Sequence, residues 1–127
     1  VTASPEPILE RRWLKEGAHI NAVGSSIPAS REIDTATMAA ARLFVDRRES
    51  ALAEAGDLLI PMKEGAVKAD HIQAELGEVI IGRDPGRRSP SELTLFKSLG
   101  LAVEDVASAA YIVRRARETG TGQTLKM

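Results

Sequence analysis

The chain has 127 residues, of which 43% are hydrophobic and 28% are charged, and its formal net charge is −1. This length allows one domain at most, and a charge so close to zero argues against a nucleic acid or a membrane as partner. Because the chain has no cysteine, disulfides and thiolate metal sites are excluded, and we expect a cytoplasmic protein.

The first part of the chain predicts a strand end, a helix and a strand. Residues 1–3 have the composition of the end of a strand whose beginning is missing. The proline-containing turn that follows favours a helix over residues 8–15, because proline at a helix start removes a donor that would be unpaired. Gly17 ends that helix. Residues 18–23 then form an apolar run of strand length, followed by a loop over residues 24–28.

The next segment predicts a helix and a second strand. Residues 35–41 are rich in alanine, and either Asp34 or Thr35 can cap the helix that they form. Residues 43–45 are apolar and precede Asp46. We therefore expect a buried strand with a polar residue at its end.

Two helices and an ambiguous run follow in the middle of the chain. Residues 49–55 predict a short helix that ends at Gly56, whereas residues 58–60 fit either a helix or a buried extended segment. Residues 70–81 have apolar side chains at helical spacing and predict a helix that ends at Gly82.

The last part of the chain predicts a loop, a strand and a long helix. Residues 83–90 are rich in Gly, Pro, Arg and Ser and are typical of a loop. Residues 93–96 predict a strand, residues 97–100 a turn, and residues 103–118 a helix that Gly120 ends. Strands that alternate with helices predict an α/β fold with a mostly parallel sheet and helices on its faces.

Two apolar runs, residues 19–26 and 94–100, end abruptly in glycine and hydroxyl residues. In open parallel sheets, ligands bind beyond the carboxyl ends of the strands. Small residues such as Gly24 let the backbone approach a flat ring, and the hydroxyls of Ser25, Ser26 and Ser98 can donate or accept hydrogen bonds. The alternative interpretation of both runs is an ordinary strand followed by a turn.

The usual catalytic and phosphate-binding motifs are missing from this sequence. There is no G-x-G-x-x-G, P-loop, H-E-x-x-H or G-x-S-x-G pattern. His19 and His71 are far apart in the sequence, so a zinc site is not expected. Asp46 is a candidate ligand contact, and Lys97 is either solvated or functional. Residues 104–105 are acidic and are better explained by their position at a helix amino terminus than by catalysis.

Taken together, these segments resemble the ornithine cyclodeaminase and mu-crystallin family. The resemblance rests on runs such as His19-Ile-Asn-Ala-Val-Gly24 and Lys97-Ser-Leu-Gly100, and it points to the mu-crystallin and ketimine-reductase-like members. The matching segments occur in family order and cover nearly the whole chain, at residues 1–4, 13–24, 31–34, 45–46, 75–82 and 94–105.

The resemblance implies a dimeric, NAD(P)-dependent enzyme with a Rossmann domain. Family members reduce imino acids, dehydrogenate alanine or cyclise ornithine. The similarity is to their C-terminal portion, so we expect residues 1–127 to form a single unit. This unit would correspond to the C-terminal half of a partial Rossmann-like domain plus a closing helix at about 101–119, with the N-terminal half missing.

The family's functional positions are carried over only where the motifs match. Cyclodeaminases have an aspartate two residues after the glycine of the first motif, where this chain has Ser26. Ser26 occupies that catalytic position but cannot act as a carboxylate base, which favours imine reduction over cyclodeamination. The residues that the resemblance places against NAD(P) are Thr2, Ala3, Ser4, Asn21, Ala22, Val23, Gly24, Ser98, Leu99 and Gly100.

Two hypotheses about function follow. The chain is part of an NAD(P)-dependent imino-acid reductase, or it is a non-catalytic module that self-associates. The absence of a glycine-rich phosphate turn favours the second for this chain alone. A sheet edge and an apolar helix stripe that relatives cover would be exposed here. We therefore expect a homodimer or a higher homo-oligomer, with exchanged helices as one possible form.

Overall fold

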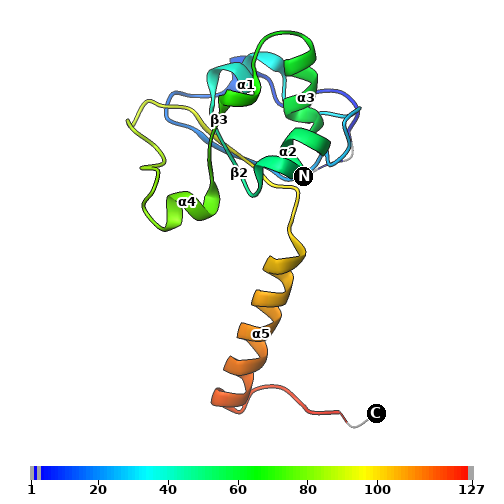
Figure 1. The fold of residues 1–127 in the computed structure, drawn as a ribbon, viewed down its shortest axis with the longest axis vertical. Coiled ribbons are helices and arrows are strands. Elements are labelled where there is room, and N and C mark those ends of the chain that lie inside the picture. The colour runs from blue at the N-terminus through cyan, green and yellow to red at the C-terminus, as the bar shows by residue number, and fades with distance from the viewer. Residues whose placement is uncertain (1, 3, 126–127) are drawn as a thin grey trace.

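A four-stranded parallel sheet forms the centre of the molecule (Figure 1). The computed structural model describes residue 2 and residues 4–125, so most of the strand end expected over residues 1–3 lies outside the described residues. The strands lie in the order β1-β4-β2-β3, and every neighbouring pair is parallel. Their bounds are His19–Ala22 for β1, Arg42–Val45 for β2, Ile72–Glu75 for β3 and Thr94–Lys97 for β4.

One face of the sheet packs against three helices in a single apolar core. These helices are α1 (Thr35–Ala40), α2 (Arg48–Glu54) and α3 (Gly56–Lys63). Alternate residues of a strand point to the same face, and this alternation gives the sheet its apolar side. The core residues that are fully buried are Met38, Leu43, Val45, Ala51, Ala55, Leu58 and Leu95.

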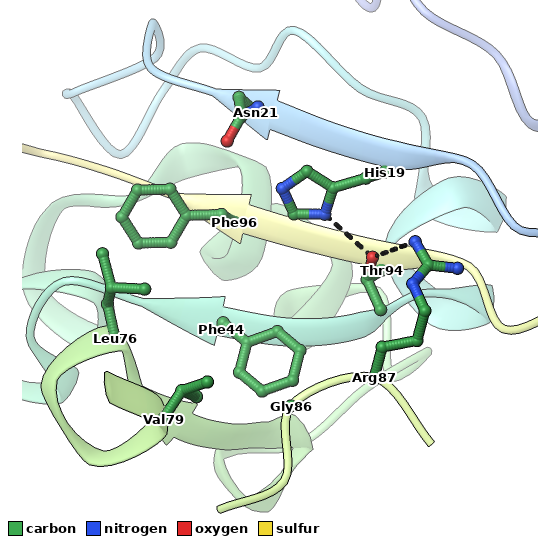
Figure 2. Close-up of a pocket in the computed structure, with 9 residues that line it drawn as sticks. All are labelled: His19, Asn21, Phe44, Leu76, Val79, Gly86, Arg87, Thr94 and Phe96. Atoms are coloured by element: carbon green, nitrogen blue, oxygen red, sulfur yellow. Dashed lines mark hydrogen bonds between the residues drawn. The ribbon is translucent and has the colours of Figure 1, made fainter. Parts of the chain in front are cut away.

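The opposite face of the sheet carries a hollow of about 500 Å³. Figure 2 shows the strand side chains on this face, with α4 (Leu76–Ile80) along one side of the hollow. Parallel sheets are normally covered on both faces, so this side is unusually open. The lining residues are His19, Asn21, Phe44, Leu76, Val79, Gly86, Arg87, Thr94 and Phe96.

The α/β fold, the parallel sheet and the long C-terminal helix are as predicted. The expected strands over 18–23, 43–45 and 93–96 correspond to β1, β2 and β4. The ambiguous run over 58–60 lies inside α3, which contains Pro61 in its later part. Loop residues 83–90 contain neither a helix nor a strand.

The helix predicted over residues 70–81 is wrong. This segment contains a 3-10 turn over Ala69–His71, then β3, and then the short helix α4. Ile72 and Ala74 are buried and pair with β2, so the long-range ladder prevails over the helical spacing of the apolar residues. Glu75 ends the strand and begins α4 through a capping box with Glu78.

The helix predicted over residues 8–15 is also wrong, since only a 3-10 turn forms, at Arg11–Trp13. Leu9 makes a parallel bridge to Ile33, and its N–H donates to the carbonyl of Glu32 at 3.0 Å. Pairing with this distant segment holds the backbone in an extended conformation that a helix cannot share.

The C-terminal helix α5 (Ala102–Thr119) projects from the body of the molecule (Figure 1). None of its residues is buried. Gly120 ends it in the left-handed conformation, at φ 66°, which glycine adopts without strain. Within the described residues, no helix is both long and apolar enough to cross a membrane.

Asp34 is expected to contribute measurably to stability as the cap of α1. Its Oδ1 accepts a hydrogen bond from the Thr37 N–H at 2.8 Å, and both carboxylate oxygens lie 3.3 Å from the Arg11 N–H. We predict that Asp34→Ala lowers the free energy of unfolding by about 1–2 kcal/mol, as measured in urea. Asp34→Asn should retain most of this stability, and an equal loss in both variants would contradict the capping role.

Candidate functional site

The two glycine-containing turns predicted to bind a ligand lie side by side at the carboxyl edge of the sheet. Gly24 follows β1, and residues 98–100 follow the neighbouring strand β4. The Ser98 N–H donates to the carbonyl of Ala22 at 3.0 Å, and the Lys97 ammonium donates to the carbonyl of Gly24. Parallel pairing of β1 and β4 therefore brings together segments more than seventy residues apart.

Asp46, at the end of β2, organises the turn after β4. Its Oδ2 accepts hydrogen bonds from the N–H groups of Leu99 at 2.6 Å and Gly100 at 2.7 Å, and from the Ser98 hydroxyl at 3.2 Å. Its Oδ1 accepts from the Arg47 N–H at 2.8 Å. Asp46 is buried, while Gly100 is exposed at φ 83°. Asp46, a candidate ligand contact from the sequence, therefore shapes the turn, and its contact with a ligand stays a prediction.

A buried ion pair lies directly beneath this edge. The Lys97 Nζ is 3.1 Å from the Asp57 Oδ2, and both side chains are 0% exposed. The other carboxylate oxygen of Asp57 accepts hydrogen bonds from the N–H groups of Glu32 at 2.7 Å and Ile33 at 3.1 Å. The pair joins the end of β4, the start of α3 and the loop after β1.

Glu32 holds the other side of Gly24. Its Oε2 accepts a hydrogen bond from the Gly24 N–H at 2.8 Å, and its Oε1 accepts one from the Thr2 N–H. Burial alone would raise the pKa of the Glu32 carboxyl, but hydrogen bonds from Thr2 and Gly24 outweigh burial and hold that pKa below its ordinary value. Gly24 is thus fixed at both its N–H and its carbonyl.

Ser25 is the least usual residue of this loop. Its φ is 54°, a left-handed conformation that non-glycine residues rarely adopt. The side chain is buried, and among the described residues its hydroxyl has no hydrogen-bond partner. Strained backbone and an unpartnered buried hydroxyl are features that cluster at binding sites.

The other predicted site residues are distributed around this edge. Asn21 lies on the open face of the sheet (Figure 2), whereas Ala22 points into the core. Val23 and Ser26 are exposed on the loop. Thr2 is exposed beside Glu32, and the Ser4 hydroxyl donates to the carbonyl of Glu6 at 2.8 Å. Ala3 lies outside the described residues. Their contacts with a coenzyme remain predictions.

His19 takes part in a small group of hydrogen bonds on the open face of the sheet. The His19 Nδ1 lies 2.8 Å from the Thr94 hydroxyl, to which Arg87 also donates at 2.8 Å (Figure 2). The Thr94 hydroxyl thus lies between the imidazole and the guanidinium. Within the part of the chain that the structure describes, no group of three His, Cys, Asp or Glu residues could hold a metal ion.

Glu32 and Asp57 form the site but were not predicted as site residues. Glu32 lies in the matching segment over residues 31–34 without a role being predicted for it, Asp57 lies in no matching segment, and both act through backbone N–H groups of other segments. Lys97 was detectable in principle, because it is two residues after Leu95 in β4 and therefore points to the same buried face. A lysine at a core position requires a buried anion, and Asp57 supplies it.

The Lys97–Asp57 pair generates a stability prediction. Lys97→Met leaves the Asp57 carboxylate buried without its counter-ion, and the expected loss is about 3–5 kcal/mol in the free energy of unfolding. Lys97→Met combined with Asp57→Asn removes the charge but keeps an oxygen for the Glu32 and Ile33 N–H groups. We expect this double variant to be more stable than the single variant in urea unfolding, and a further loss would contradict the charge argument.

The lowered pKa of Glu32 generates a pH prediction. In the folded state the carboxyl binds its proton less readily than in the unfolded chain, where its ordinary pKa is 4.5. Its contribution is therefore present above about pH 4.5 and is lost as the pH falls through the lower folded-state value. Unfolding free energies measured over a pH series should fall less steeply below that pH in Glu32→Gln, and an unchanged slope would disprove this assignment.

Comparisons with known proteins agree with this geometry. Residues 1–120 match the model of the ornithine cyclodeaminase/mu-crystallin family. The chain is 42% identical to a Delta(1)-pyrroline-2-carboxylate reductase of Bacillus cereus over 98% of this chain and 38% of that protein. It is 51% identical to the mouse ketimine reductase mu-crystallin, over 88% of this chain and 33% of that protein.

A solved structure gives the same result for the fold. Delta(1)-pyrroline-2-carboxylate reductase of Thermococcus litoralis, in complex with NADH and L-proline, superposes with a TM-score of 0.88 at 44% identity, over 98% of this chain and 38% of that chain. The chain thus spans 33–38% of the length of these relatives. With the family model matched over nearly all of its residues, the chain belongs to the ornithine cyclodeaminase/mu-crystallin family.

Proposed function

We propose that this chain forms the part of an NAD(P) site that lies against the nicotinamide in an imino-acid reductase. The observation that carries the proposal is the pair of glycine-containing turns held together at the carboxyl ends of β1 and β4. A relative that is 44% identical has a structure with NADH and L-proline, and its fold matches this one. Ligands of open parallel sheets bind at this edge.

The residues present fit a flat ring. Gly100 is exposed and has open space where a side chain would be, and the buried hydroxyl of Ser25 lacks a partner within the described chain. The Asp46 carboxylate is occupied by backbone N–H groups, and the Asp57 carboxylate is paired with Lys97 and is buried, so the edge offers backbone groups and hydroxyls. When bound, the nicotinamide supplies or accepts a hydride. This chain's turns would orient the ring and exclude water from one side of it.

The substrate class follows from position 26 and from the relatives. Ser26 is exposed on the loop after β1. A hydroxyl there can position an imino acid or a water molecule but cannot act as a carboxylate base. We therefore favour reduction of an imino acid, as the names of the relatives indicate.

The lack of cysteine supports a cytoplasmic location.

A second candidate function is a non-catalytic module that self-associates. The observation in its favour is the lack of a glycine-rich phosphate turn in the sequence. For this reason, we propose that turnover requires a further segment or partner that carries that turn. The two candidates differ in whether the present chain retains any affinity for the coenzyme.

Titration of the chain with NADPH, followed by nicotinamide fluorescence, tests the proposal. We expect micromolar binding that weakens about tenfold or more in Asp46→Ala, because that change releases the N–H groups of Leu99 and Gly100. Asp70→Ala is the matched control, since Asp70 is exposed near the opposite end of β3. No binding at millimolar NADPH would reject the proposal and favour the second candidate.

A further inference from the structure

Ser25 has two features that make the folded chain less stable than it could be. Its φ of 54° lies in the left-handed region, where the Cβ atom crowds the backbone. The residue is only 6% exposed, and its hydroxyl has no hydrogen-bond partner among the described residues. A buried hydroxyl without a partner has lost the hydrogen bonds that water gives it in the unfolded chain.

The backbone immediately before Ser25 is fixed by two hydrogen bonds. The Gly24 N–H donates to the Glu32 carboxylate at 2.8 Å, and the Gly24 carbonyl accepts from the Lys97 ammonium. Both partners are buried side chains that belong to other segments of the chain. The peptide group that leads into Ser25 therefore has one orientation.

The loop after Ser25 is packed against the start of α3. The carbonyls of Ile27 and Ser30 lie so close to Gly56 that a Cβ atom added to this glycine would collide with both. The Ser30 N–H also donates to the Ile27 carbonyl at 3.3 Å, which closes a tight turn. Because the chain is held on both sides of position 25, the left-handed conformation cannot relax, which is typical of strained residues at functional sites.

Glycine at position 25 would avoid both of these unfavourable features. Glycine adopts a positive φ without strain and has no hydroxyl to bury. The serine in this position therefore indicates a use for the hydroxyl that the folded chain by itself does not show. A ligand that supplies the missing hydrogen bond removes the cost of burying the hydroxyl.

Ser25 differs in this respect from the other serines of the two turns. The Ser98 hydroxyl already donates to the Asp46 Oδ2 at 3.2 Å, and Ser26 is exposed to water. A ligand that binds either of these groups must replace an existing hydrogen bond. A ligand that binds the Ser25 hydroxyl replaces none, so this hydrogen bond contributes more to affinity.

We propose that the Ser25 hydroxyl hydrogen-bonds the carboxamide group of the nicotinamide. This inference rests on the proposed function, in which the ring lies against the turns after β1 and β4. The carboxamide has a carbonyl acceptor and an N–H donor, and a hydroxyl can bind either of them. Rotation of the side chain about χ1 carries the hydroxyl between staggered positions while the backbone stays fixed. Ser25 thus selects a ring that carries this group.

Stability and coenzyme affinity test the inference, because they should change in opposite directions in the same variants. Ser25→Ala removes the unpaired hydroxyl, and Ser25→Gly also removes the crowded Cβ atom. We expect the melting temperature to rise by about 2–4 °C in Ser25→Ala and by at least as much in Ser25→Gly. The affinity for NADPH, measured by nicotinamide fluorescence, should weaken about fivefold in both variants.

Ser91→Ala is the matched control. Ser91 is exposed in the loop before β4, at the opposite end of that strand, and its hydroxyl contacts that of Ser89 in the same loop. This variant should keep the melting temperature and the NADPH affinity of the unaltered chain. A loss of both stability and affinity in Ser25→Ala would show that the hydroxyl supports the fold, and would overturn the inference.

The same titrations separate this inference from the proposed function. If the unaltered chain fails to bind NADPH at millimolar concentration, the proposed function is rejected, and the role of Ser25 with it. If the unaltered chain binds NADPH and the Ser25 variants bind it equally well, the role of Ser25 alone is rejected.

A coenzyme analogue in which hydrogen replaces the carboxamide identifies the group that Ser25 binds. NADP and its pyridine analogue are each used to displace NADPH from the unaltered chain and from Ser25→Ala. The preference for NADP over the analogue should shrink about fivefold in Ser25→Ala, because the analogue has no carboxamide for the hydroxyl to bind. An unchanged preference would mean that the hydroxyl binds another group, and would overturn the assignment.

Discussion

The fully buried Lys97–Asp57 ion pair is the contact on which the carboxyl edge of the sheet depends. Two opposite charges in an apolar interior are stable only when each also satisfies its remaining hydrogen-bonding groups. Here Lys97 also binds the carbonyl of Gly24, and Asp57 also accepts the N–H groups of Glu32 and Ile33. The charge of one strand residue thus determines the course of a loop that is distant in the sequence.

Three carboxylates together shape this edge of the sheet. Asp57 fixes the loop after β1 from below, Glu32 fixes the N–H of Gly24, and Asp46 fixes the turn after β4. Each uses backbone N–H groups as its partners, and such charge-assisted hydrogen bonds are stronger than neutral ones. The result is a rim of backbone and hydroxyl groups whose supporting charges lie inside the protein.

Much of the architecture could be predicted from the sequence, because apolar runs that end in glycine or a polar residue mark β1, β2 and β4 clearly. The prediction of a helix over residues 70–81 failed because the spacing of Ile72, Leu76 and Val79 fits a helix. The pairing of this segment with β2 depends on a strand about thirty residues earlier in the chain. The roles of Asp57 and Glu32 were not detectable for the same reason: their partners are backbone groups that only the folded chain brings near. The resemblance to the family identified which residues lie at this edge of the sheet. The supporting roles of the Asp57 and Glu32 carboxylates could be found only from the structure.

The open face of the sheet also has a thermodynamic consequence. Among the side chains of the hollow, Phe96, Leu76 and Val79 are partly exposed to water before the protein unfolds, although Phe44 and Thr94 are buried. The heat-capacity increment of unfolding follows the apolar area newly hydrated, so a sheet wetted on one side has a smaller increment than one enclosed between two helical layers. The stability of this chain should accordingly vary gently with temperature, with a broad, shallow maximum instead of a sharply curved one.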